Sequence, residues 1–303
     1  MRVNYFLNKL NECSIESFNI NDREHFIPEN KLESYDVSVI IPVLNRDNII
    51  GKTLRTLQKA ISDSDYVINL IVVEYSEKSK HKNLCVNSNI EYFYLKSICD
   101  SSFNKSLTMN IGSFIANNSK YFLFHDVDCL VPNNFFELLF KNVNNVNANI
   151  IQTFGGGRLS YCSERLTKNI LTKDLSIDSF IQFKSDITIP ESTILGIKAP
   201  GGSILINKDL FIKVGGFDYE LFSGYSPEDA FFKNKCETLG ETLFGSDNPF
   251  IEQYHLYHEA SRIPEIEMLN YVNIFNSLSK IEKLEYLKVK NLKMISDLNK
   301  FLG

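Results

Sequence analysis

Short apolar runs alternate with segments of helical spacing through the first half of the chain. The run Val37–Val43 is rich in β-branched residues and is typical of a strand that is buried on both faces. By the same patterns, strands are predicted at 37–43, 67–74, 90–95 and 121–125, and helices at 48–60 and 106–117. Because this alternation indicates βαβ units, we expect an α/β fold with a mostly parallel central sheet flanked by helices.

The second half of the chain is less regular. Strands are predicted at 150–154 and 201–207, and helices at 209–214 and 228–239. Apolar positions recur at helical spacing through 264–302, which predicts an amphipathic helix or a pair of helices. Five lysines lie on this segment: Lys280, Lys283, Lys288, Lys290 and Lys293. Since glutamates alternate with them, a solvated face is the simpler interpretation, and docking on a membrane surface is the alternative.

Composition narrows the classes of function. The chain of 303 residues carries a net charge of −5, which argues against nucleic acid as its partner. Its six cysteines include no C-x-x-C pair, so no cysteine-based zinc site is expected. The first residues lack the continuous apolar segment of a secretion signal, and no apolar run is long enough to span a membrane. We therefore expect a cytoplasmic protein with no transmembrane segment.

Polar residues that follow predicted strands are the first candidates for a site, because ligands of parallel α/β sheets bind beyond the carboxyl ends of the strands. Asn45 and Arg46 follow the first predicted strand, and Glu74 ends the second. Asp126 and Asp128 follow the fourth. Two carboxylates separated by one residue can share a divalent cation, and Mn²⁺ or Mg²⁺ suits such ligands. A strand end followed by a solvated turn is the alternative.

Two further pairs of residues are candidates for catalysis or metal binding. Glu228 and Asp229 open a predicted helix, where acidic residues are favoured by the helix dipole, so a charged helix N-terminus competes with a general base. His255 and His258 are three residues apart. Either one could complete the coordination of a cation bound by the aspartates, and ordinary surface histidines are the alternative.

Four segments together resemble a nucleotide-sugar glycosyltransferase of the GT-A fold, close to glycosyltransferase family two. They are Val39–Arg46, Phe103–Gly112, Phe124–Asp128 and Gly201–Asp229. The second half resembles the C-terminal domain of β-1,4-galactosyltransferases and of bacterial chondroitin-type polymerases. The resemblance implies a GT-A (Rossmann-like) domain at 36–262, with a nucleotide-binding half at 36–130 and an acceptor or catalytic half at 131–262. An N-terminal extension (1–35) precedes it and a C-terminal amphipathic helical tail (263–303) follows it.

The resemblance also implies an activity. A hexose or N-acetylhexosamine would move from a UDP-sugar to a hydroxyl of a glycan or lipid-linked glycan acceptor, with inversion and with Mn²⁺ or Mg²⁺ as cofactor. The implied setting is the synthesis of a bacterial surface polysaccharide in the cytoplasm. Peripheral contact with the inner face of the membrane through the C-terminal helix is the alternative that its lysines leave open.

Site residues follow from the same resemblance. The residues that the resemblance implies in donor binding are Pro42, Asn45, Arg46, Glu74, Lys105 and Asp126. The metal ligands are Asp128 and Asp126, with His255 as the further ligand and His258 in reserve. Asp229 is the implied catalytic base. The acceptor site is formed by Glu228, which holds the acceptor hydroxyl, together with Tyr225 and Gly202.

The chain departs from the family pattern at two places. The G-W-G-x-E-D motif reads Gly224-Tyr225-Ser226-Pro227-Glu228-Asp229, and the chain contains no Trp. Lys105 stands where galactosyltransferases have an arginine, so a point charge replaces a bidentate fork. These departures leave the donor sugar open. The competing functions are a non-catalytic carbohydrate-binding protein with a degenerate transferase fold and, with less support, a nucleotidyltransferase.

Overall fold

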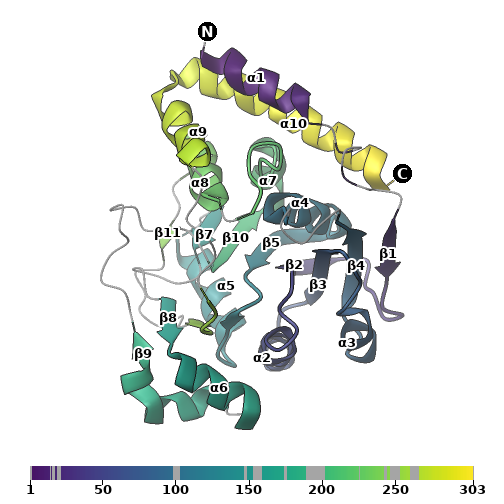
Figure 1. The fold of residues 1–303 in the computed structure, drawn as a ribbon, viewed down its shortest axis with the longest axis vertical. Coiled ribbons are helices and arrows are strands. Elements are labelled where there is room, and N and C mark those ends of the chain that lie inside the picture. The colour runs from purple at the N-terminus through teal and green to yellow at the C-terminus, as the bar shows by residue number, and fades with distance from the viewer. Residues whose placement is uncertain are drawn as a thin grey trace.

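A mixed sheet of eight strands runs through the centre of the molecule (Figure 1). The computed structural model describes residues 2–13, 15, 18, 22–97, 103–146, 149–152, 159–173, 176–188, 202–224, 226–241, 244–245, 253–259 and 266–302. The strand order is β1-β4-β3-β2-β5-β10-β7-β11. The strands are β1 (Arg23–Phe26), β2 (Tyr35–Val43), β3 (Ile68–Ser76), β4 (Glu91–Lys96), β5 (Ser119–His125), β7 (Ile150–Gln152), β10 (Ser203–Asn207) and β11 (Phe244–Gly245). Because β4, β3, β2 and β5 pair in parallel, the predicted α/β fold with a mostly parallel centre is confirmed.

Helices cover both faces of this sheet (Figure 1). They are α1 (Arg2–Glu12), α2 (Ile50–Ser62), α3 (Lys82–Asn87), α4 (Lys105–Ile115), α5 (Phe135–Val146), α6 (Glu164–Lys173), α7 (Lys208–Lys213), α8 (Glu228–Thr238), α9 (Ile266–Ser277) and α10 (Lys280–Leu302), with a 3₁₀ segment η4 (Ile177–Asp186). Every strand and helix predicted through residue 239 begins and ends within two residues of its predicted bounds. The apolar pattern at 264–302 corresponds to a pair of helices, α9 and α10.

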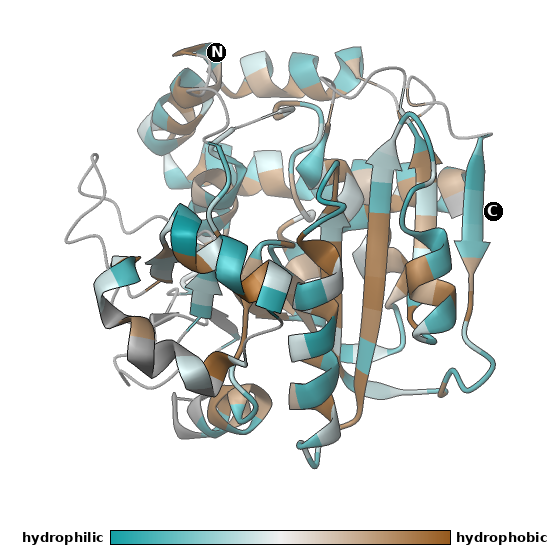
Figure 2. Cartoon of the chain, turned by 60° about the horizontal axis from the view of Figure 1, so that its bottom comes forward, coloured by the Kyte–Doolittle hydropathy of each residue, from teal (hydrophilic) through white to brown (hydrophobic). Residues whose placement is uncertain are grey.

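Strand β2 contributes side chains to the hydrophobic cores on both faces of the sheet, because successive side chains of a strand point to opposite faces. Val39 and Ile41 pack in the cluster that contains Leu54 of α2, whereas Ile40 packs in the cluster that contains Leu107 of α4. The central strands are accordingly among the most hydrophobic parts of the chain, and the surface helices mix hydrophilic and hydrophobic residues (Figure 2). The continuous apolar run of this strand therefore reflects burial on both sides.

Helix α4 lies unusually close to the sheet. A Cβ atom at Gly112 would lie 2.3 Å from Cγ2 of Ile40, so only glycine permits this approach. At the other end of the helix, the Asn104 side chain caps the N-terminus by accepting a hydrogen bond from the Leu107 amide at 2.8 Å. The same side chain donates to the carbonyl of Tyr219 at 2.8 Å. These contacts fix the position of Lys105, the first residue of α4.

A second, four-stranded sheet extends from the end of β5. Its order is β6-β12-β8-β9, with β6 at Cys129–Leu130, β12 at Gln253–His255, β8 at Leu159–Cys162 and β9 at Ile187–Thr188. Strand β12 pairs antiparallel with β6, which places His255 opposite Cys129. The pairing brings residues separated by more than a hundred positions in the sequence to the end of β5.

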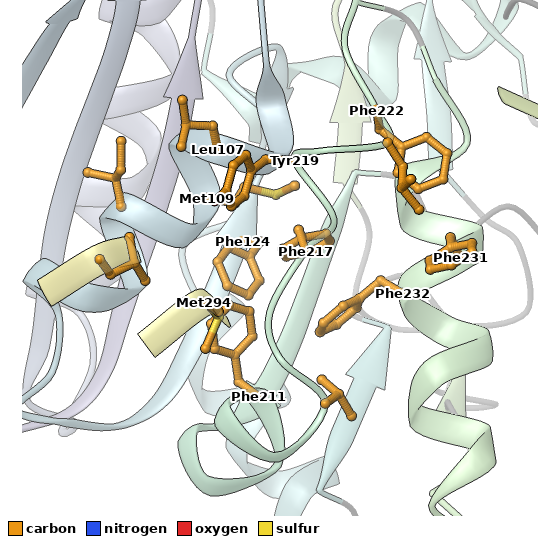
Figure 3. Packing of buried hydrophobic residues seen from close by; sticks show 14 of the residues in the cluster. Leu107, Met109, Phe124, Phe211, Phe217, Tyr219, Phe222, Phe231, Phe232 and Met294 are labelled. Carbon is orange, nitrogen blue, oxygen red and sulfur yellow. The ribbon is translucent and has the colours of Figure 1, made fainter. Parts of the chain in front are cut away.

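Aromatic side chains join the sheet to α7 and α8 (Figure 3). The ring of Phe217 stacks on that of Phe232 with centroids 4.1 Å apart, and it meets Phe124 edge-on at 5.0 Å. Phe124 belongs to β5 and Phe232 to α8, so the aromatic cluster ties the strand that precedes Asp126 to the helix that begins with Glu228. Such ring pairs stabilise a core by about 0.5–1.5 kcal/mol beyond their burial.

The N-terminal segment forms part of the same fold. Strand β1 pairs antiparallel with β4 at the edge of the sheet, and α1 lies along α10 (Figure 1). Phe6 of α1 is fully buried and its ring meets that of Tyr286 at 5.4 Å. Among the helices that the structure describes, none is long and apolar enough to cross a membrane.

Charged residues of α10 are buried against the segment that precedes the Gly224 turn. Lys290 pairs with Glu220 at 2.6 Å, and both side chains are fully buried. Tyr286 donates a hydrogen bond to Asp218, whose other oxygen lies 2.5 Å from the Lys235 ammonium. The interpretation of the lysines on this segment as a solvated face is therefore wrong for Lys290, because its partner lies 70 residues away and the local charge pattern does not reveal it.

We predict that Lys290→Met lowers the free energy of unfolding by about 3–5 kcal/mol, because it leaves the Glu220 carboxylate buried without its cation. Chemical denaturation followed by circular dichroism measures the change. The double variant Lys290→Met/Glu220→Leu removes both charges and should recover most of the loss. An unchanged denaturation midpoint for the single variant would contradict the role of this pair.

Candidate active site

The Lys105 ammonium lies among three carboxylates. Its Nζ atom is 2.9 Å from Oδ1 of Asp126, 3.4 Å from Oε1 of Glu228 and 3.5 Å from Oδ2 of Asp229. The four side chains come from the start of α4, the residue after β5 and the first turn of α8. Fold topology thus gathers residues that the sequence separates by more than a hundred positions.

Burial and neighbouring charges shift the pKa values of Lys105 and Asp229. Burial alone would lower the pKa of the Lys105 ammonium, but the carboxylates of Asp126, Asp229 and Glu228 raise it well above its usual range. Burial raises the pKa of the Asp229 carboxyl to about 8, against the opposing effect of the Lys105 cation. Asp229 therefore titrates near neutral pH, which is the property required of a general base.

Both oxygens of Asp126 have partners within the protein. Oδ1 faces Lys105, and Oδ2 accepts a hydrogen bond from the Gly202 amide at 3.0 Å. The Asp126 amide donates in turn to the Gly202 carbonyl at 2.7 Å. Gly202 has a φ of 87°, in the region that favours glycine. These bonds tie the end of β5 to the start of β10.

Asp128 lies in a separate group with the two histidines. Its Oδ1 atom is 3.4 Å from Nε2 of His255, and its Oδ2 atom is 3.0 Å from Nε2 of His258. The Asp128 carbonyl accepts a hydrogen bond from the Leu256 amide at 2.8 Å, which holds this turn against β12. The sequence interpretation held His258 in reserve, and the fold places both histidines beside Asp128.

The donor atoms of this group fit a divalent cation. One carboxylate oxygen of Asp128 and one imidazole nitrogen from each histidine lie within 4.8 Å of one another. Among the described residues, these three side chains form the cluster of potential metal ligands. Burial alone would raise the pKa of Asp128, but the hydrogen bond from His258 and the charges of both histidines lower it to about 2. The hydrogen bond with Asp128 raises the pKa of His258. A cation would take the place of these protons, so its binding should release protons.

The loops that follow β2 and β3 lie beside the Asp128 group, at the same ends of the parallel strands. Asn45 has a φ of 49°, and its Oδ1 atom accepts a hydrogen bond from the Lys80 ammonium. Arg46 lies 3.8 Å from Asp128, measured from Nε to Oδ2. Pro42 is buried one residue before the end of β2. These residues connect the first strand loop to the Asp128 group.

Glu74, expected near the nucleotide, is fully buried with its carboxylate directed to the protein. Its oxygens accept hydrogen bonds from the Tyr92 hydroxyl at 2.6 Å, the Ser76 hydroxyl at 2.7 Å and the His81 amide at 3.1 Å. The Lys80 amide also donates to it, at 3.2 Å. Glu74 thus fixes the loop that carries Lys80 and His81.

The structure describes two of the three residues that the sequence predicts for the acceptor site. Glu228 is buried and accepts a hydrogen bond from the Ser226 hydroxyl at 2.8 Å, and Gly202 pairs with Asp126 as above. Tyr225 lies outside the described residues. The sequence interpretation missed Ser226 and Lys80 as site residues. Lys80 could have been found by its place after β3, whereas the bond of Ser226 to Glu228 depends on the conformation of the turn.

Comparison of sequences identifies the family. The sequence model of the family described as glycosyltransferase like family 2 matches residues 38–235, which is more than half of the chain. The chain belongs to glycosyltransferase-like family 2. This membership confirms the family suggested by the four sequence segments. No curated protein matches this family 2 chain.

Solved structures share its fold. A mutant of Drosophila β-1,4-galactosyltransferase 7, solved with manganese, UDP-Gal and xylobiose, is 12% identical over 78% of this chain and 79% of its own, with a TM-score of 0.50. S. aureus TarS 1–349, solved with UDP-GlcNAc, is 17% identical over 86% of this chain and 73% of its own, with a TM-score of 0.53. At these identities the likeness concerns the fold, and it confirms the expected GT-A architecture.

We predict that Asp128→Asn weakens Mn²⁺ binding by this family 2 protein more than about tenfold, since even indirect partners of metal ligands contribute that much. His258→Ala should have a similar effect. Titration of free Mn²⁺ followed by electron paramagnetic resonance measures the affinity. Asp209→Asn, which removes an exposed carboxylate at the start of α7, is the matched control. Equal affinities for wild type and Asp128→Asn would exclude the Asp128 group as the cation site.

Proposed function

We propose that the chain transfers a hexose or N-acetylhexosamine from a UDP-sugar to a hydroxyl of a glycan acceptor, with inversion at the anomeric carbon. The observation that carries this proposal is the pair of adjacent groups at one sheet edge. The mostly buried carboxylate of Asp229, with a pKa of about 8, lies in the Lys105 group, and a carboxylate with two imidazoles lies two residues beyond Asp126. The UDP-sugars bound to the galactosyltransferase and to TarS support the choice of donor.

Asp229 is proposed as the general base. Its carboxylate takes the proton of the acceptor hydroxyl while that oxygen attacks the anomeric carbon, and the bond between this carbon and the UDP oxygen breaks with its electron pair going to UDP. A base of this kind contributes about 10²–10⁴-fold to the rate. Because a single displacement occurs from the face opposite the leaving group, the configuration inverts.

Glu228 is proposed to orient the acceptor. The Ser226 hydroxyl holds one of its carboxylate oxygens, and the Lys105 ammonium lies 3.4 Å from the other. With these partners Glu228 has a fixed position beside Asp229 and can accept a hydrogen bond from a sugar hydroxyl. Gly202 and Tyr225 are proposed to complete the acceptor surface.

Asp128, His255 and His258 are the residues that would hold a divalent cation. When bound, the cation would neutralise the diphosphate and stabilise UDP as a leaving group. Imidazole donors suit Mn²⁺ better than Mg²⁺, which prefers oxygen ligands and bound water. We therefore propose Mn²⁺ as the cofactor. Asp126 contributes to this site by binding Lys105 and Gly202.

The donor is proposed to bind along the loops after β2 and β3. Pro42, Asn45 and Arg46 are proposed to line the uridine and diphosphate, and the positive charge of Arg46 suits the latter. Glu74 is proposed to shape this subsite indirectly, because its carboxylate fixes the backbone amides of Lys80 and His81. The resemblance to chondroitin-type polymerases supports a role in bacterial surface polysaccharide synthesis, with a glycan or lipid-linked glycan acceptor in the cytoplasm.

Asp229→Asn should keep the fold and lose transfer by at least about 100-fold, because the amide takes up no proton. The assay measures UDP release from UDP-Gal, UDP-GalNAc, UDP-Glc and UDP-GlcNAc with Mn²⁺ and with EDTA. Release of pyrophosphate from a nucleotide would indicate nucleotidyl transfer instead. Absence of UDP binding in calorimetry would favour the carbohydrate-binding alternative, and wild-type turnover of Asp229→Asn would exclude this base.

Lys105→Met should move the acid limb of the pH profile of kcat/KM to higher pH. The Lys105 cation lowers the pKa of Asp229, so its removal raises this pKa above about 8 and the base loses its proton only at higher pH. Lys105→Arg keeps the charge and should hold the limb near its original place. A limb that stays in place or moves to lower pH in Lys105→Met would contradict the coupling.

A further inference from the structure

The outer face of α10 carries a stripe of exposed apolar side chains. Ile281 is 79% exposed, Leu284 40%, Leu292 61% and Ile295 37%. These positions are separated by three, eight and three residues, which keeps them on one side of a helix with 3.6 residues per turn. From Ile281 to Ile295 the stripe is about 21 Å long. Single exposed apolar residues are ordinary, but several aligned on one side of a helix indicate an interaction surface.

The charges on the same face are mostly positive. Of the exposed charged residues of α10, Lys288 lies within the stripe, and Lys280 and Glu285 lie about 80° and 60° from its centre at 100° per residue. This excess of lysine contrasts with the net charge of −5 on the whole chain. Buried or partly buried charges of α10 are compensated from within, since Lys290 pairs with Glu220 and Lys293 pairs with Asp297. The partner of this face should therefore be both apolar and anionic.

A second copy of the chain fits this face poorly. Lys288 lies on the stripe midway between Ile281 and Ile295. Two copies paired along the stripe, antiparallel about its midpoint or parallel in register, would place Lys288 against its own counterpart. Like charges opposed in this way destabilise a helix pair. In a lipid surface, by contrast, the lysine stem can bend and carry its ammonium to the phosphates.

We propose that α10 docks the protein on an anionic bilayer surface, with the stripe of Ile281, Leu284, Leu292 and Ile295 among the lipid headgroups and the exposed lysines on lipid phosphates. An amphipathic helix with apolar residues on one side and lysines beside them binds such surfaces in the plane of the interface. Figure 1 places α10 and α1 at one end of the molecule and α6 and β9 at the other, so docking leaves the second sheet turned away from the lipid. The inference does not depend on the reaction proposed above.

The test is co-sedimentation of the full chain with vesicles of phosphatidylcholine alone and of phosphatidylcholine with phosphatidylglycerol. We expect binding to the anionic vesicles only, weakened by salt. Ile281→Ser/Leu292→Ser should weaken it at least about tenfold, because two apolar side chains lose their burial. Lys288→Glu should weaken it by a similar factor, since one positive charge becomes negative near the lipid.

The matched control is Ile27→Ser/Leu32→Ser, which removes two side chains that are 51% and 52% exposed between β1 and β2. It should bind vesicles as the wild type does, and thermal unfolding should be alike in all variants. Failure of the wild type to bind anionic vesicles, or wild-type binding by Ile281→Ser/Leu292→Ser, would overturn the proposal. So would a dimer in sedimentation velocity that Ile281→Ser/Leu292→Ser abolishes, because the stripe would then belong to a second copy.

Discussion

The ion-pair cluster around Lys105 is the interaction on which the proposed active site depends. Asp126, Glu228 and Asp229 reach one buried place from two parts of the chain, and unit charges about 4 Å apart interact with roughly 4 kcal/mol near a protein surface. One ammonium cannot balance three carboxylates, so the site has an excess of negative charge. Burial raises the pKa of Asp229 to about 8, which allows this carboxyl to hold a proton near neutral pH. The property that suits Asp229 to proton transfer is thus a consequence first of burial, and the charges of Glu228 and Asp126 add to it.

The rest of the molecule holds the elements that carry these charges. Gly112 lets α4 approach the sheet, the aromatic cluster around Phe217 joins β5 to α8, and the second sheet brings His255 to Asp128. Helix α10 contributes from the opposite side, because its buried Lys290 and Tyr286 bind Glu220 and Asp218 in the segment that leads to the Gly224 turn. Helix α10 therefore helps to hold in place the segment that leads to the proposed active site.

The sequence predicts the sheet and its helices because burial on two faces and helical periodicity leave local patterns. It also locates Asp126 and Asp128, since polar residues after buried strands must lie at the carboxyl edge. What the pattern cannot provide is the partner of each group. The Glu74 carboxylate accepts a hydrogen bond from the His81 amide in the loop after β3. Lys290 pairs with Glu220, a buried glutamate 70 residues away in the sequence. Both histidines reach Asp128 because the segment that carries them is held there by the pairing of β12 with β6, and these two short strands carry no periodicity of their own.

In the proposed site the two aspartates have different roles: Asp128 binds the cation, and Asp126 stays with Lys105 and Gly202. The most direct measurement is a crystal structure of the protein soaked with Mn²⁺ and UDP, with anomalous scattering recorded at the manganese edge. We predict one strong peak within ligand distance of Asp128, His255 and His258, with Asp126 still bound to the Gly202 amide. A peak ligated by Asp126 without either histidine, or no peak at this edge with UDP bound, would contradict it.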